Sequence, residues 1–198
     1  MPADDSGVIE AERPVRTRRL TSEEFMTAVE AGAFPDVPQI ELVDGELVEM
    51  PPEGSLHAVN VKRTLLVLER IVQRHPPLEL ASGMAVGLGA GRVVGPDAVV
   101  FVPQPGWPAT TPASAVRLAV EHSFSTRRYD LTRKADLYAE AGVPEYWVLD
   151  DVEPRLHRFH TPSGGAYLRD PPLGVDAEVE VPFAPGEHVR VGDLFRLD

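Results

Sequence analysis

The feature that most constrains the fold is a set of three apolar, β-branched runs between residues 93 and 150. These runs cover residues 93–102, 116–123 and 145–150. In the first run, Ala98 and Val100 point to one face of an extended chain and Val99 points to the other, so both faces are apolar. A strand with two apolar faces is covered on both sides. The pattern therefore predicts strands in the middle of a sheet rather than at a wet surface.

Each of the first two runs carries one acid. Asp97 lies within the first run at the edge of a core, and Glu121 follows the apolar residues 118–120 of the second run. A carboxylate in such a place loses hydration, which is costly unless a cation or a hydrogen bond compensates. Two carboxylates that converge from neighbouring strands would form a hard, oxygen-rich site for Mg²⁺ or Mn²⁺.

A lysine is the third member of this group. The helical pattern after Tyr129 places Leu131, Ala135 and Tyr138 on an apolar stripe, and Lys134 falls inside that stripe. Of the 19 lysines and arginines only two are lysines, at positions 62 and 134. Lysine offers a compact charge whose pKa responds to burial. One interpretation is a functional lysine beside the two acids, and the other is a side chain that reaches past its neighbours to water.

These residues occur in an order that resembles a known family. The order is Pro96-Asp97, then Glu121, then a lysine on the next helix, then the segment Ala-Glu-Ala-Gly-Val-Pro-Glu-Tyr-Trp-Val-Leu-Asp at 139–150. It resembles the Uma2 family, also called DUF820, which is assigned to the PD-(D/E)XK, or restriction-endonuclease-like, superfamily. The resemblance extends upstream through residues 41–52 and 55–57, and it covers roughly residues 20–159.

One position departs from the superfamily pattern. The residue two places after Glu121 is Ser123, where the superfamily has a lysine. In the resembled family the lysine is understood to have moved to the helix, which is the place that Lys134 occupies. We expect Lys134 to remain protonated and to bridge Asp97 and Glu121, because two nearby carboxylates oppose the effect of burial on its pKa.

The resemblance implies a metal-dependent endonuclease that hydrolyses phosphodiester bonds of DNA, with Mg²⁺ or Mn²⁺ as cofactor. The residues implied for catalysis are Asp97, Glu121, Lys134 and His57. Those implied as metal ligands are Asp97, Glu121 and Glu41, with the carbonyl group of the residue after Glu121 as an added ligand. Two of these have other interpretations, since His57 is equally a satisfied core residue, and Glu41 and Glu46 both lie on a hairpin that could be solvated.

A second functional hypothesis is a nuclease-like scaffold that binds protein or nucleic acid without turnover. Two observations favour it, the net charge of −12 with a pI of about 4.9, and Ser123 in place of lysine. Proteins that depend on nonspecific phosphate contacts are usually basic. Metal binding separates the two hypotheses, because only the endonuclease needs an ion at the acids.

Length and composition set the organisation of the chain. Its 198 residues fit one domain, which we place at 17–198, after a flexible polar arm at 1–16. The absence of any apolar run long enough to span a bilayer predicts no membrane partner. The absence of cysteine excludes disulfides and fits a cytoplasmic protein. A homodimer is a further expectation.

The coarse element order predicts the fold class. The capping box Thr21–Glu24 opens a helix that ends before Gly32, and Asp44-Gly45 is a type I′ turn pair in a hairpin at 40–50. A helix at 57–74 follows, and a third helix begins with Asp130 as its N-cap. Strands are expected at 78–88, 93–102, 116–123 and 145–150, with short C-terminal strands within 157–168, 178–182 and 187–195. The resemblance implies an α/β fold, with a mixed sheet in a restriction-endonuclease-like αβββαβ core.

Overall fold

A mixed sheet forms the centre of the computed structural model, which describes residues 16–37, 39–106 and 108–196. The sheet has seven strands within these residues, and all neighbours are antiparallel except β8 and β9, which are parallel. The strands in spatial order are β11 (Ala166–Arg169), β10 (Arg155–Ser163), β9 (Glu145–Asp150), β8 (Val116–Ser123), β6 (Ala98–Phe101) and β3 (Glu79–Ala81), with β12 (Leu173–Gly174) also beside β10.

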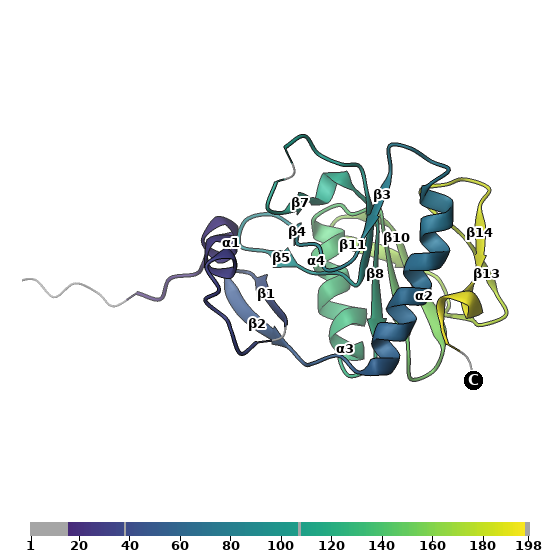
Figure 1. Cartoon of the computed structure of the whole chain (residues 1–198), viewed down its shortest axis with the longest axis horizontal. Coiled ribbons are helices and arrows are strands. Elements are labelled where there is room, and N and C mark those ends of the chain that lie inside the picture. Colours follow the sequence, from purple (N-terminus) through teal and green to yellow (C-terminus); the bar gives the residue numbers. More distant parts are fainter. Residues whose placement is uncertain (1–15, 38, 107, 197–198) are drawn as a thin grey trace, which may run out of the picture.

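Helices cover both faces of this sheet. Helix α2 (Ser55–Val72) packs with Ala98 and Val100 of β6, whereas α4 (Ala135–Glu140) packs with Val99 and Phe101 (Figure 1). Side chains that alternate along β6 thus belong to two separate cores, as the period of two predicts. The order α2, β3, β6, β8, helix, β9 confirms the expected α/β fold with an αβββαβ core.

A second sheet lies beside the core at the N-terminal end of the molecule (Figure 1). It contains the hairpin β1 (Gln39–Val43) and β2 (Glu46–Met50), then β5 (Val93–Val94), β4 (Val86–Gly87) and β7 (Thr111–Pro112). Helix α1 (Ser22–Glu30) has the expected capping box. Its Phe25 is buried with Leu42 of β1 and Val93 of β5. The hairpin turn also agrees with the prediction, since Asp44 and Gly45 both have positive φ.

The two long strands expected at 78–88 and 93–102 are wrong in their extent. Each is broken into two short strands that belong to different sheets, β3 with β6 and β4 with β5. The first break contains Gly83 at φ 66, which turns the chain. The second break contains Gly95-Pro96, and proline has no N–H to continue a ladder. The second break places Asp97 at a bend between the two sheets.

The helix that carries Lys134 begins earlier than expected. It starts with α3 (Arg127–Tyr129), passes through a π-helical turn η2 (Asp130–Lys134) and continues as α4. Asp130 is therefore inside the helix and is not its N-cap. Its carboxylate accepts hydrogen bonds from the hydroxyl groups of Ser123, at 2.7 Å, and Thr126, at 2.5 Å. Single π turns occur frequently at functional sites, and this one ends at Lys134.

The C-terminal part forms a small sheet and a short helix at the opposite end from the hairpin (Figure 1). The strands are β13 (Glu178–Glu180) and β14 (His188–Arg190). The strand expected at 187–195 ends at Arg190, because the chain turns into the 3-10 helix η3 (Val191–Leu194). Another 3-10 turn, η1 (Ala113–Ala115), precedes β8. The arm expected at 1–16 lies outside the described residues up to position 15.

None of the helices in the described part of the chain combines the length and the apolar character that crossing a bilayer requires.

Candidate active site

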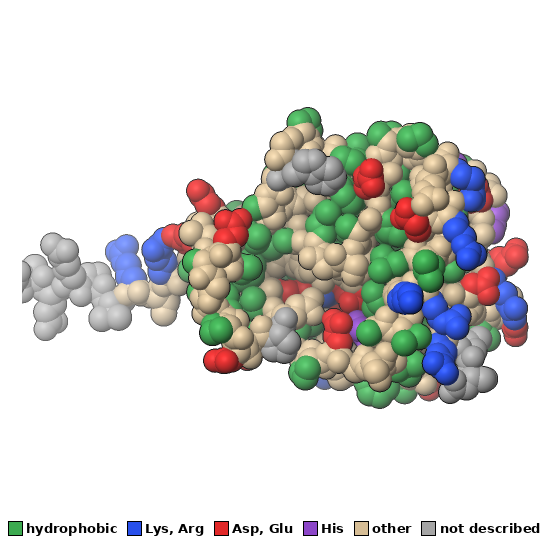
Figure 2. Space-filling model, viewed as in Figure 1, with side chains coloured by type: hydrophobic (Ala, Val, Ile, Leu, Met, Phe, Trp, Pro, Cys, Tyr) green, Lys and Arg blue, Asp and Glu red, His purple; other side chains and the backbone are tan. Residues whose placement is uncertain are grey.

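A cavity of about 290 Å³ lies where the hairpin, the start of α2 and the end of β8 meet. Acidic side chains and a histidine are visible in the hollow between the α1 side and the α2 side of the molecule (Figure 2). The predicted site residues Asp97, Glu121, Lys134 and His57 all line this cavity. The structure therefore brings together four side chains from four separate elements, α2, the bend before β6, β8 and the helix that carries Lys134.

Lys134 is held between two carboxylates. Its Nζ atom lies 2.7 Å from Oε1 of Glu121 and 3.0 Å from Oε1 of Glu41, and Lys134 is only 1% exposed. The same Glu41 oxygen accepts a hydrogen bond from the Gly95 amide at 3.1 Å. This arrangement corrects the expected bridge to Asp97, because the second acid at the ammonium group is Glu41.

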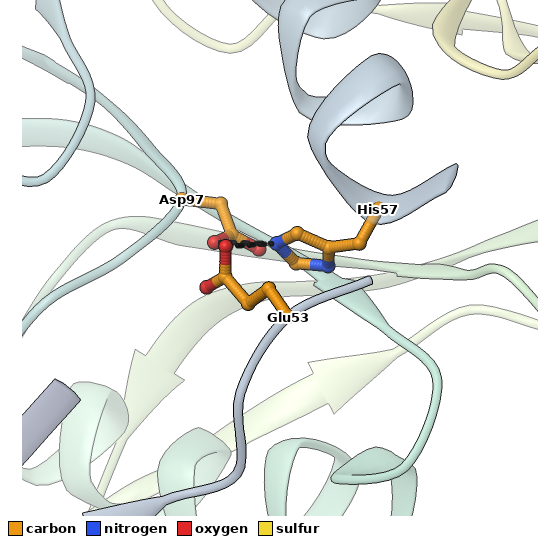
Figure 3. A group of neighbouring side chains, drawn as sticks. All are labelled: Glu53, His57 and Asp97. Atoms are coloured by element: carbon orange, nitrogen blue, oxygen red, sulfur yellow. Dashed lines mark hydrogen bonds and ion pairs between the residues drawn. The ribbon is translucent and has the colours of Figure 1, made fainter. Parts of the chain in front are cut away.

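Asp97 instead belongs to a second group, with His57 and Glu53 (Figure 3). Nε2 of His57, on the first turn of α2, lies 3.2 Å from Oδ1 of Asp97 and 3.1 Å from Oε2 of Glu53. Among the described residues these three have ligand atoms that all lie within 4.8 Å of one another. Glu53 was not predicted. The signal that could have identified it is its spacing of four residues from His57.

The other carboxylate oxygen of Asp97 is fixed by the backbone. The amide of His122 donates to Oδ2 of Asp97 at 2.7 Å. The buried His122 ring is itself held, with Nδ1 2.9 Å from Oδ1 of Asp151 and Nε2 2.8 Å from the hydroxyl of Thr64. Asn60 donates to the same Asp151 oxygen at 3.0 Å. A buried polar network thus fixes the end of β8, whose His122 amide holds Asp97.

The pKa values of the site follow from burial and crowded charge. Burial alone would lower the pKa of Lys134, but the charges of Glu121 and Glu41 outweigh it and hold that pKa well above its usual value. Burial raises the pKa of Glu121 well above its usual value, and the nearby carboxylates raise it further against the opposing effect of Lys134. A cation placed beside Glu121 would favour the charged form of this carboxyl group.

His57 shows the same balance. Burial lowers its pKa, but the hydrogen bond to Asp97 and the charges of Asp97 and Glu53 have the larger combined effect, so the pKa is raised from 6.5. A protonated His57 is therefore a second internal cation, next to the group that contains Asp97. In this arrangement each cation is paired with two carboxylates.

The donor set fits a divalent metal ion. It consists of two neighbouring groups, Glu53, His57 and Asp97, whose ligand atoms lie within 4.8 Å of one another, and Glu121 and Glu41, which meet at Lys134. Carboxylate oxygens of this kind suit Mg²⁺ or Mn²⁺. In addition, Oε2 of Glu41 is buried and has no hydrogen-bond partner among the described residues. A buried carboxylate oxygen without a partner, next to the other carboxylates of the site, is a place where a cation would be stabilised.

Three other residues considered from the sequence lie apart from this donor set. Glu46 is exposed and pairs with Arg19 at 3.0 Å, so Glu41 is the hairpin acid that approaches the site. Ser123 is buried and donates to Asp130, which leaves its hydroxyl group engaged in the structure of the helix start. Asp130 lines the same cavity but forms no ion pair with Lys134 among those found.

Comparisons with known proteins agree with this fold. A solved structure of a nuclease described as "putative", belonging to DUF820 from Anabaena variabilis, superposes with a TM-score of 0.70 at 19% identity. The match covers 89% of this chain and 97% of that chain. No curated protein matches the chain. The family model described as "Uma2: Putative restriction endonuclease" matches residues 23–191. Because this match spans most of the chain, the protein belongs to the Uma2 family.

Proposed function

We propose that this protein is a Mg²⁺- or Mn²⁺-dependent endonuclease that hydrolyses phosphodiester bonds of DNA. The observation that carries the proposal is a buried lysine which lines the same cavity as Asp97 and is paired with Glu121. The family description supports a nuclease function. A buried lysine among carboxylates is unusual in a purely structural core. Burying charged groups costs free energy, and such clusters are often found at functional sites.

The residues have distinct proposed roles. Asp97 and Glu121 would hold the metal ion, with Glu41 and the carbonyl group of His122 as added ligands. A bound Mg²⁺ supplies a water of lowered pKa and draws charge from the phosphate. Lys134 has three N–H groups, and its two carboxylate partners use two of them. The third would orient the attacking water or meet the negative charge that develops on the phosphate.

His57 would act through Asp97. Its imidazole fixes one oxygen of Asp97 at 3.2 Å while the His122 amide fixes the other at 2.7 Å. A carboxylate held at both oxygens is preorganised for an ion or for a water. When protonated, His57 would also bind a phosphate oxygen at the cavity mouth.

A larger groove supports a macromolecular substrate. Its volume is about 900 Å³, and it meets the smaller cavity at Asp97 and Glu53. Lys62 and Val29 also line this groove. A chain of nucleotides could therefore enter the site from the groove, with Lys62 available to one of its phosphates.

Cleavage and metal binding test the proposal together. We expect DNA, supplied as supercoiled plasmid and as single strands, to be cut with Mg²⁺ or Mn²⁺ and to remain intact with EDTA. Asp97→Asn should abolish both cleavage and the calorimetric signal of Mn²⁺ binding. Lys134→Arg should fold and bind Mn²⁺ nearly as well but lose most activity, because arginine retains the charge and changes its shape.

Glu46→Gln is the matched control, since it removes an exposed carboxylate from the same hairpin as Glu41 and should leave cleavage unchanged. Full activity in both Asp97→Asn and Lys134→Arg would overturn the proposal. No Mn²⁺ binding at millimolar concentration, with intact Asp97 and Glu121, would favour a nuclease-like binding module without turnover.

A further inference from the structure

One aromatic residue that lines the site is largely exposed. Phe124 is 62% exposed, and every other Phe, Tyr or Trp within residues 16–37, 39–106 and 108–196 is buried or half-buried. Phe124 follows β8 directly, three residues after Glu121, and lines the cavity that contains Glu121 and Asp97. A single exposed apolar residue is ordinary on a protein surface, but this one lies on the rim of the candidate active site.

The rim of this cavity, meaning its exposed lining residues, is uncharged apart from Glu53, whereas its buried lining is acidic. Leu56, which is 47% exposed, lines the cavity together with Phe124, and so do the exposed Pro51 and Pro52. The only Lys or Arg among its described lining residues is Lys134, which is already paired with two carboxylates. Inside this cavity, affinity for a polyanion therefore does not come from unpaired lysine or arginine side chains, the usual source of nucleic-acid affinity.

An unpaired nucleotide fits a cavity with an acidic floor and apolar side chains at its rim. Its phosphate would lie on the metal ion at the acidic floor, and its base would lie against the apolar rim. Bases stack on exposed aromatic side chains in many single-strand-binding proteins, and the contact tolerates any base because each has a π face. In a duplex the bases are stacked on one another, so their faces are not available to Phe124.

We propose that Phe124 is a base-stacking platform and that the substrate at this site is an unpaired polynucleotide strand. This inference rests on the proposed nuclease function for the position of the phosphate. It goes further by naming the substrate class and the side chain that selects it.

Fluorescence of 2-aminopurine provides the test, because its emission is quenched when the base stacks on an aromatic ring. The full chain is titrated into single-stranded DNA and RNA oligonucleotides carrying one 2-aminopurine, and into the matching duplexes, with Ca²⁺ as a hard oxygen-binding cation. A gel of the same sample verifies that the strand remains intact. The variants are Phe124→Ala, Phe124→Leu and Phe124→Trp, with Leu168→Ala as an exposed apolar control far along the sheet.

We expect the wild type and Phe124→Trp to quench the single strand. Phe124→Ala should abolish quenching and raise the Kd about tenfold, in line with the usual strength of base–aromatic stacking. Phe124→Leu should also abolish quenching, and Leu168→Ala should behave as wild type. The duplex should bind more weakly than the single strand, and the DNA and RNA arms show which strand chemistry is preferred.

The inference is overturned if Phe124→Ala binds and quenches as the wild type does, or if the duplex binds more tightly with no loss in that variant. The outcome is separate from that of the nuclease proposal. Quenching that depends on Phe124 without Mg²⁺-dependent cleavage would retain the stacking platform and reject the nuclease. Mg²⁺-dependent cleavage together with unaltered binding in Phe124→Ala would retain the nuclease and reject the stacking platform.

Discussion

The ammonium group of Lys134 lies 2.7 Å from a carboxylate oxygen of Glu121, and both side chains are almost excluded from solvent. A buried ion pair is weak evidence for stability, because desolvation offsets much of the attraction. Removing one partner is different, because it leaves an uncompensated charge in the interior. The stability of the folded protein should therefore depend strongly on Lys134.

Lys134→Met should lower the free energy of unfolding by about 3–5 kcal/mol, because Glu121 and Glu41 would remain buried without their cation. Urea denaturation in EDTA measures this. Lys62→Met is the matched control, since Lys62 is exposed and should change stability by no more than about 0.5 kcal/mol. The double variant Lys134→Met/Glu121→Gln should recover part of the loss. A loss in the double variant equal to the sum of the singles would contradict the coupling.

The stability of the metal-free protein should depend on the ionisation of His57. Its pKa is raised in the folded state, so protonated His57 stabilises the fold. That contribution is fully present below the unfolded pKa of about 6.5 and is lost as pH rises through the folded value. Denaturant titrations in EDTA from pH 5 to pH 9 should show this decline in the wild type. In His57→Gln the decline should be smaller, and identical pH curves would reject the assignment.

Thr64→Val should destabilise the network beneath the site. The hydroxyl group of Thr64 lies 2.8 Å from Nε2 of the buried His122 ring, and valine has the same shape without that group. An unsatisfied buried polar atom costs about 1–3 kcal/mol. Urea denaturation of Thr27→Val, which removes an exposed helical hydroxyl, provides the control and should show a much smaller change. Equal changes in the two variants would show that His122 does not depend on this contact.

Gly45→Ala should displace the hairpin that carries Glu41. Gly45 has φ 81, and a methyl group there would collide with the side chain of Arg19. Gly32→Ala is the control, because Gly32 has φ 69 but open space around it, so it carries only the conformational cost of about 1–2 kcal/mol. We expect Gly45→Ala to lose more stability than Gly32→Ala in thermal unfolding, and also to lose nuclease activity. Similar losses would mean that the hairpin can shift freely.

Much of the fold could be predicted because its signals are local. The alternation of Val99 and Val100 assigns each side chain to one of two cores, and Asp44-Gly45 defines its turn through positive φ. The burial of Lys134 follows from its place on an apolar helical stripe, although the π turn around it was not foreseen. In each case the determining pattern is complete within a few residues of the chain.

The partners within the site could not be predicted in the same way. Nothing local shows that Glu41 rather than Asp97 meets Lys134, because that contact depends on how the hairpin packs against β5. Glu53 follows two prolines in a loop, and its contact with His57 appears only in the folded chain. The strand breaks at Gly83 and Pro96 were hidden because the apolar pattern continues across them, so hydrophobic periodicity alone joined segments that belong to different sheets.

The position of Glu41 shows that the segment forming the core and the segment forming the candidate site have different boundaries. The αβββαβ core begins at Ser55, but one of the two acids that hold Lys134 lies on a strand before it. A shortened chain that starts at α2 would retain every element by which the architecture is recognised, yet it would leave the lysine with half of its counter-charge. The elements that define the core are thus not enough to complete the site. The N-terminal hairpin is part of the proposed catalytic site and not an appendage to the core.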